Sequence, residues 1–211
     1  MTRYRSFVPA LLAVALLCGC AGLIGGPSEP TSVYAPVLDS QPDAAWPTVT
    51  WSLDLARQSS APALDGPSIM VSPTPGELQA YRGARWAQVP GAMIETSLLR
   101  TLEDSGKITS VSRQGSGAAA TYRLLLDLRD FRSDYAGGAT PSATIEVNAK
   151  LLHLSDQAIV GSHTFKIVQP SSGVDVAQVS DAFAKALDTL GHDLAGWTLE
   201  TGQAHERQHS R

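Results

Sequence analysis

The sequence predicts an α+β fold, a two-layer sandwich in which a mixed or antiparallel sheet of about five strands carries two long helices on one face. Two observations lead to this class. Three strand-like segments with alternating apolar residues follow one another over residues 121–169, and consecutive strands are typical of α+β proteins rather than doubly wound sheets. Two segments with helical periodicity, 90–106 and 176–197, each present an apolar stripe that needs a partner. The expected order is ββαβββα.

The first half of the domain supplies two strands and a helix. TVTWSLDLA, residues 48–56, alternates between apolar and polar positions and is expected to be a strand. SIMVSPT, residues 68–74, is a second strand, closed by prolines. A helix is expected from about Pro90, because the first helical turn does not need the N–H that proline lacks. Gly106 is expected to end this helix.

The second half supplies three strands and the last helix. TYRLLLDLRDFRSDY, residues 121–135, is a long strand; residues 142–154 and 158–169 are joined by a short turn and are expected to form an antiparallel hairpin. The final helix has one stripe at steps of three and four: Val176, Val179, Phe183, Leu187, Leu190, Leu194 and Trp197. Beyond Thr198 the chain is polar, and residues 199–211 are expected to be a disordered tail.

The N-terminus reads as a secretory signal. Arg3 and Arg5 precede an apolar run that ends at Leu17, and this run is too short to cross a bilayer. The two cysteines, Cys18 and Cys20, are poorly placed for a disulfide or a metal site. The segment LLCGCAG instead resembles the lipobox of bacterial lipoproteins, with Cys20 as the lipidated residue after removal of residues 1–19. The alternative is an ordinary secretory signal with incidental cysteines.

Lipidation at Cys20 would place the protein on a membrane surface, since two or more acyl chains make a stable anchor. Ala21 follows, rather than the aspartate that holds enterobacterial lipoproteins in the inner membrane, so the periplasmic face of the outer membrane is expected. Residues 20–47 contain five prolines and are expected to be a flexible tether, with a short strand docked over residues 34–38. Residues 48–198 would then form a single domain.

Composition excludes several classes of partner. Loss of residues 1–19 removes two arginines and no acidic residue, so the net charge changes from −4 to −6. An acidic body argues against nucleic acids, whose binding requires clustered basic residues. It also argues against a polybasic grip on anionic lipid. No cysteine follows Cys20, so ordinary packing must hold the fold.

No catalytic constellation stands out, and neither an enzyme activity nor a cofactor is expected. The sequence lacks a G-x-S-x-G elbow, an H-E-x-x-H motif and a P-loop. By strand parity His153 and His163 could face each other across the hairpin as a metal pair, but two ordinary surface histidines are the simpler interpretation. Alternating charges in the long strand, Asp127, Arg129, Asp130, Arg132 and Asp134, are explained by ion pairing on a solvated face.

The segment LQAYRGARWAQVP, residues 78–90, has the composition favoured at protein interfaces. Tyr81, Arg82, Arg85 and Trp86 lie close together in it and combine the aromatic and arginine side chains that dominate interface energetics. These four residues are the candidate partner-binding site. The alternative for Trp86 is that it packs the start of the following helix.

This segment also carries a resemblance. Residues 63–106 resemble the auxiliary lipoprotein component of bacterial ABC-type transport systems, the paraquat-inducible protein C-like family. The matching positions are Leu64, Asp65, Ile69, Val71, Tyr81, Arg85, Trp86, Ala87, Pro90 and Ser105–Gly106. The strand YRLLLDLRDF, the hairpin and the last helix also match, so the resemblance covers roughly residues 33–198. Gln88 departs from the pattern, where an acidic residue is common, and Val89 intervenes before Pro90.

The resemblance implies a periplasmic lipoprotein that works beside an ATPase, a permease and a substrate-binding protein with an Mce (mammalian cell entry) domain. Such systems are thought to move phospholipids or other hydrophobic molecules between membranes, and the lipoprotein would dock the Mce-domain protein at the outer membrane. It would be non-catalytic, with a homo-oligomer left open. Two rivals remain: a lipid- or small-molecule-binding module, and a structural envelope lipoprotein.

Overall fold

A long three-stranded meander forms the centre of the fold. The computed structural model describes residues 30–39 and 41–209, and within them one mixed sheet has nine strands. The strands are β1 (Ser32–Tyr34), β2 (Ser52–Leu55), β3 (Ser59–Ser60), β4 (Ser68–Ser72), β5 (Gln79–Trp86), β6 (Ser110–Arg113), β7 (Tyr122–Asp134), β8 (Ser142–His153) and β9 (Ala158–Pro170). The helices are η2 (Pro62–Leu64), α2 (Pro90–Ser105) and α3 (Val176–His209). The predicted α+β class is confirmed.

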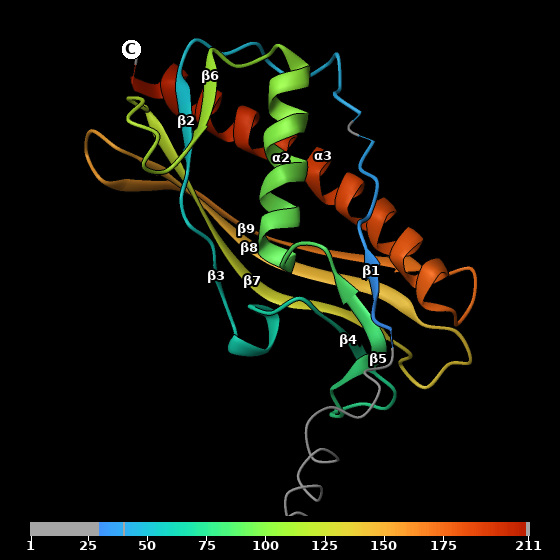
Figure 1. Cartoon of the computed structure of the whole chain (residues 1–211). Coiled ribbons are helices and arrows are strands. Elements are labelled where there is room, and N and C mark those ends of the chain that lie inside the picture. Colours follow the sequence, from blue (N-terminus) through green and yellow to red (C-terminus); the bar gives the residue numbers. More distant parts are fainter. Residues whose placement is uncertain (1–29, 40, 210–211) are drawn as a thin grey trace, which may run out of the picture. The chain divides into compact units, whose positions relative to one another are not determined.

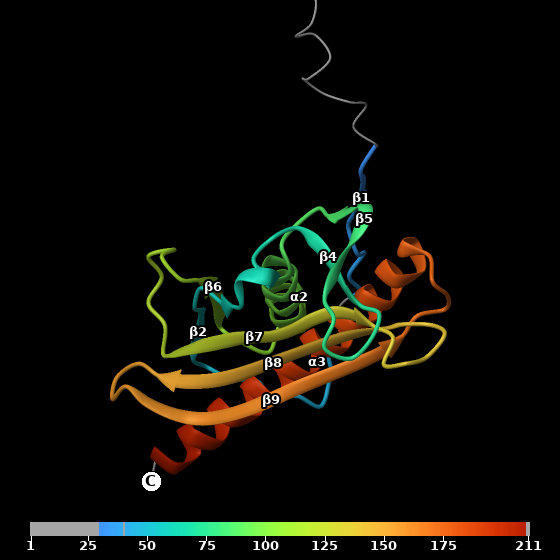
Figure 2. The ribbon, with the colours of Figure 1, turned by 90° about the horizontal axis from the view of Figure 1, so that it is seen from below.

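The meander is antiparallel, as the sequence predicted. β8 pairs with β7 on one side and with β9 on the other. Alternate residues of β7 are buried, beginning with Tyr122, Leu124, Leu126 and Leu128. One side of the strand therefore points into the core, where α3 covers the three strands (Figures 1 and 2).

Four further strands, β1, β3, β5 and β6, explain why the sheet has more strands than the five expected. β2, β3 and β4 pair in turn along the free edge of β7, at Tyr122–Leu124, Asp127–Leu128 and Ser133–Asp134. β6 then pairs with β2, and β5 with β4. Strands of two to five residues leave little periodicity in the sequence, so this edge of the sheet is defined by long-range pairing.

The two long helices pack on each other and on the sheet. α2 begins at Pro90 and ends at Gly106, whose φ of 61° is left-handed, which confirms both expected ends. Ser97 of α2 donates its hydroxyl to the Leu187 carbonyl of α3 at 2.9 Å. The predicted stripe of α3 is buried at Val179, Phe183, Leu187, Leu190 and Leu194. Phe183 stacks on Phe131 of β7, with ring centroids 4.6 Å apart.

Both ends of the packed region extend beyond the expected limits. Helix α3 does not stop at Thr198 but continues to His209, so a disordered tail is wrong for residues 199–209. Leu199 is fully buried, and Gly202 lies against Trp51. At the other end, residues 32–34 form β1, and Trp46 is only 7% exposed. The later part of the expected tether is therefore docked. Cys20 lies outside the described residues, so its lipidation stays a prediction.

Candidate functional site

Strand β5 contains a large irregularity at the predicted interface segment. Between two pairings with β4, Ser68 with Arg85 and Met70 with Ala80, β4 advances two residues and β5 advances five. The extra residues bulge out of the ladder, and Gly83 takes a left-handed φ of 63° there. A bulge bends its strand and re-aims the neighbouring side chains. We call residues 81–85 the β5 bulge.

The bulge presents two arginines to solvent. Arg82 and Arg85 are exposed. Neither forms an ion pair with any residue of the described chain. By contrast, Arg113, Arg123, Arg129 and Arg132 each pair with a carboxylate. An exposed guanidinium group without an ion-pair partner is able to bind a carboxylate or phosphate.

The two aromatic residues of the predicted site are anchored differently. Tyr81 is half-buried, and its hydroxyl lies 3.1 Å from Ser133 Oγ on β7. Burial is the main cause that raises the pKa of Tyr81. Trp86 is fully buried, edge-on to Phe183 at 5.1 Å and to Phe131 at 6.1 Å. Trp86 thus follows the core-packing alternative and offers no surface to a partner, while Tyr81 fixes the base of the bulge.

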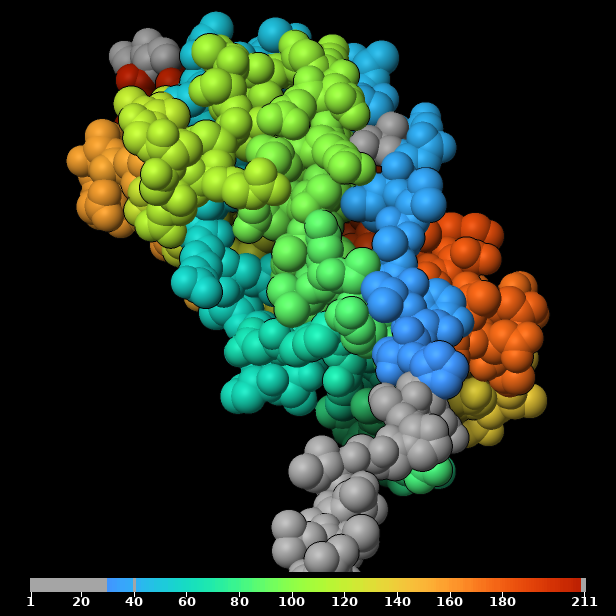
Figure 3. All heavy atoms as spheres, in the orientation of Figure 1, coloured from blue at the N-terminus to red at the C-terminus, as the bar shows by residue number. Residues whose placement is uncertain are grey.

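Strand β1 holds the N-terminal segment against the end of β5. Ser32, Val33 and Tyr34 pair in parallel with Ala84, Arg85 and Trp86, and the Ala87 N–H donates to the Tyr34 carbonyl at 2.7 Å. The segment then runs over the surface beside α2, as Figure 3 shows in blue and green. A pocket of about 160 Å³ lies under it, lined by Ala35, Pro36, Leu38, Ala87, Gln88, Met93, Arg100 and Leu187.

The alternating charges of β7 form ion pairs mostly along the strand. Arg132 lies 3.2 Å from Asp130 and 3.2 Å from Asp134, and Arg129 lies 3.3 Å from Asp127. One contact crosses to Glu146 of β8, at 4.0 Å from Arg129. This agrees with ion pairing on a polar face, although the pairs lie along the strand rather than across it. Desolvation outweighs Arg132 and raises the pKa of Asp130.

The two strand histidines do not face each other. His153 pairs with Ala158, whereas His163 pairs with Ala149, four residues earlier along β8. The hypothesis of a metal pair between them is wrong. His163 instead lies beside Phe165, with ring centroids 4.6 Å apart. His153 contacts His205 at the end of α3, in the segment expected to be a disordered tail.

The family model of the ABC-type transport auxiliary lipoprotein component matches residues 34–195. The chain belongs to this family. No curated protein matches the sequence detectably. Among the described residues, no helix is long and apolar enough to cross a membrane.

Two solved structures resemble this auxiliary lipoprotein. The crystal structure of protein XCC0632 from Xanthomonas campestris is 50% identical, covers 84% of this chain and 99% of its own, and has a TM-score of 0.81. A second crystal structure, of an uncharacterized protein, is 13% identical, with a TM-score of 0.62 over 79% of this chain and 97% of its own. At that identity the second likeness shows the fold alone.

Most residues that carried the resemblance serve the fold. Ile69 and Trp86 are fully buried, Pro90 opens α2, and Gly106 ends it. Arg85 is the exception, since it is exposed and unpaired among the described residues. It is therefore the family-motif residue best placed to act outside the domain.

Proposed function

We propose that this auxiliary lipoprotein is a non-catalytic docking subunit that captures the Mce-domain protein of its transport system on the β5 bulge. The system would move lipids or other hydrophobic molecules between the two membranes. Family membership supports the association with an ABC transporter. The observation that carries the site is the bulge itself, which presents Arg82 and Arg85 without an intramolecular partner in the described chain.

The chemistry of the bulge indicates a partner with acidic groups. Arginine is favoured at interfaces because its planar guanidinium binds carboxylates with two parallel hydrogen bonds. The partner's recognition surface would then carry aspartate or glutamate at this contact. Tyr81 contributes by holding the base of the bulge through Ser133, so that the two arginines are positioned before the partner arrives.

The proposed anchor agrees with the position of β1. Nine residues lie between Cys20 and Pro30, the first described residue, and the ten Cα–Cα steps of an extended chain over this stretch reach at most about 35 Å. Since β1 pairs with the last residues of the bulge and with Trp86, the docking surface would remain near the membrane that holds Cys20. We propose the periplasmic face of the outer membrane.

The rival proposal, a module that holds lipid itself, has less support. The apolar pocket beneath the N-terminal segment has a volume of about 160 Å³, whereas pockets for small-molecule ligands span roughly 300–1,000 Å³. The larger pocket between β3 and α2, at about 580 Å³, is lined largely by polar and charged groups, including Arg57, Ser60, Asp65 and Glu95. Neither offers an acyl chain a deep apolar site.

Co-purification tests the docking proposal. The tagged lipoprotein is expressed with the Mce-domain protein encoded beside it, and capture of that protein is quantified. The double variant Arg82→Ala/Arg85→Ala should lower capture at least tenfold. Arg207→Ala is the matched control, because Arg207 is also exposed and unpaired within the described chain but lies at the end of α3. Capture that is equal for both variants would reject the bulge as the site.

A further inference from the structure

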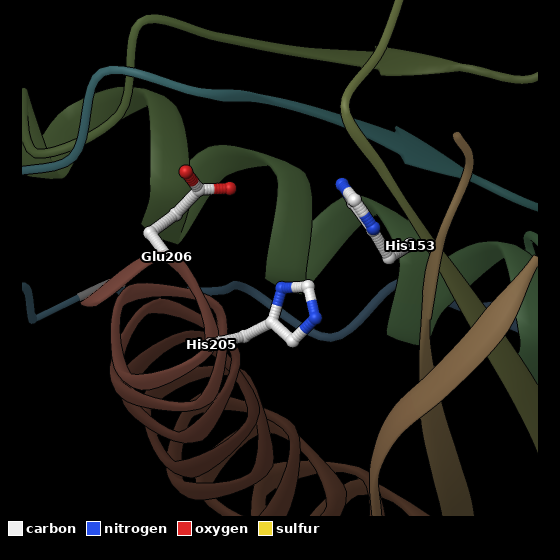
Figure 4. Close-up of side chains that lie close together, drawn as sticks. All are labelled: His153, His205 and Glu206. Atoms are coloured by element: carbon white, nitrogen blue, oxygen red, sulfur yellow. The ribbon is translucent and has the colours of Figure 1, made fainter. Parts of the chain in front are cut away.

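Three of the chain's five histidines gather at the end of the domain away from the β5 bulge. His153 is the last residue of β8, and His205 and His209 lie near the end of α3. The imidazole rings of His153 and His205 are 4.7 Å apart, and those of His205 and His209 are 4.0 Å apart. Glu206 completes the group. Figure 4 shows His153, His205 and Glu206 side by side, from β8 and α3.

Ligand atoms of His153, His205 and Glu206 all lie within 4.8 Å of one another, and all three residues are half-buried. The Tyr122 hydroxyl closes the group from β7. It lies 2.7 Å from His205 Nδ1 and donates to Glu206 Oε1 at 2.8 Å. One hydroxyl is thus within hydrogen-bond distance of both His205 and Glu206, and it holds these two side chains on the same side of α3.

We propose that His153, His205 and Glu206 bind one divalent transition-metal ion, with Zn²⁺ as the best match. Two imidazoles and one carboxylate are a ligand set that zinc accepts at nitrogen and oxygen distances of about 2.0–2.2 Å. Calcium and magnesium prefer sets made of oxygen ligands alone. The fourth position is left for the Tyr122 oxygen or for water.

The surroundings of the three ligands suit a metal. Asp156 Oδ1 lies 3.0 Å from His153 Nδ1, and a carboxylate that holds one ring nitrogen of a histidine orients the other toward a metal. Burial, followed by the neighbouring His209 and His153, lowers the pKa of His205.

A second triad shares His205 with Asp156 and His209. It is the weaker candidate, because Asp156 and His209 are both exposed and Asp156 already contacts His153. In the proposed site Asp156 supports His153 from behind, and His209 is a neighbour rather than a ligand. The two arrangements differ in whether Glu206 or His209 is required.

Two of the three proposed ligands lie beyond the region that the family model matches. The family model ends at residue 195, ten residues before His205. A bound ion would tie the last turns of α3 to the end of β8, two segments that are 52 residues apart in the sequence. Its role would be to fix the end of the helix on the sheet.

Calorimetric titration of the purified full-length chain with ZnCl₂ tests the proposal. We expect one Zn²⁺ per chain with a Kd of micromolar or below, and a higher Tm in its presence. His205→Ala and Glu206→Gln should each weaken binding at least tenfold, and His153→Gln should do the same. His163→Ala is the matched control, because His163 lies on the same hairpin but outside the group, and it should bind like the parent chain.

Circular dichroism of each metal-free variant separates loss of ligand from loss of fold. Where His205→Ala fails to fold, Glu206→Gln and His153→Gln carry the test, since Glu206→Gln keeps the shape of the side chain and His153→Gln keeps a polar side chain of similar size. The proposal is overturned by an absence of stoichiometric Zn²⁺ in the parent chain, or by binding in Glu206→Gln as tight as in His163→Ala. Larger losses in His209→Ala than in Glu206→Gln would overturn the ligand assignment in favour of the outer triad.

Discussion

Gly191 sets how closely α3 approaches α2, and its replacement by alanine is expected to destabilise the domain. A Cβ atom at Gly191 would lie 2.3 Å from Ser97 Oγ and 3.2 Å from Thr101 Oγ1. Ser97 cannot move without loss, because it is buried and donates to the Leu187 carbonyl at 2.9 Å. The two helices must therefore separate or the hydrogen bond must break.

The expected size follows from three contributions. Overpacking of a close contact costs about 1–3 kcal/mol, and loss of the Ser97 hydrogen bond costs about 1 kcal/mol. Alanine in place of glycine within a helix contributes about 1 kcal/mol in the other direction. The free energy of unfolding should thus fall by about 1–3 kcal/mol, which for a domain of this size lowers Tm by about 2–12 °C.

Thermal and urea denaturation of Gly191→Ala measure this loss, and a second substitution tests its cause. Ser97→Ala removes the atom that collides, so Ser97→Ala/Gly191→Ala should be more stable than the sum of the two single changes predicts, by about 1 kcal/mol or more. Gly66→Ala is the control, because nothing lies within 4 Å of the added carbon. The reasoning is refuted if Gly191→Ala is as stable as the parent chain, or if the two substitutions are additive.

Three further predictions concern the ends of the domain and the α2 terminus. A chain that begins at residue 48 should have a lower Tm and a greater tendency to aggregate than one that begins at residue 30, because it lacks buried Trp46 and exposes the β5 edge; equal melting curves would contradict the docking of this segment. Gly106→Ala should cost about 1 kcal/mol or more, since Gly106 has a φ of 61°, and unchanged urea midpoints would count against it. The folded state lowers the pKa of His205, so the unfolded chain takes up a proton more readily than the folded chain does. The stability that neutral His205 contributes is therefore lost as pH falls below the ordinary histidine pKa of about 6.5. The stability of the metal-free chain should therefore drop as pH falls below about 6.5, and drop less in His205→Gln; parallel pH profiles would exclude His205 as a contributor.

Local patterns in the sequence predicted the parts of the fold that depend on local chemistry. Both ends of α2 were readable, because Pro90 and Gly106 act through the backbone of their own turns. The stripe of α3 and the alternation of β7 were readable because each element is long enough to repeat its period several times. The meander followed from three such strands in a row.

The docked edges were not predictable in the same way. β1 is three residues long and pairs with a strand about fifty residues away, so no local periodicity marks it. The β5 bulge breaks the alternation that would identify a strand, and the segment was expected only as an interface. The last turns of α3 were misread because Thr198 and Gly202 are small or polar, although both are buried; small residues there admit the large Trp51 ring.

The candidate metal ligands were missed for a related reason. His205 and Glu206 continue the three- and four-residue spacing of the α3 stripe through Thr198 and Gly202, and that continuation was the available signal. Their partner His153 is 52 residues earlier, so only the pairing of β8 with β7 and the full length of α3 bring the group together. Arg82 and Arg85 were found because their composition stands out within one short segment.

Strand β1 also determines how the domain would respond to a mechanical load. A pull on the chain before Pro30 is borne first by three residue pairs with β5. Next in line are the bonds from the Asp39 N–H to Asp188 and from His192 to the Gln41 carbonyl, and then the buried ring of Trp46. Peeling these contacts would release about sixteen residues, or roughly 50 Å of extended chain, while the meander and α3 remain folded. In a protein anchored by its N-terminus, tension would thus lengthen the linker between the anchor and the domain, and the reach of the domain would depend on the force applied to it.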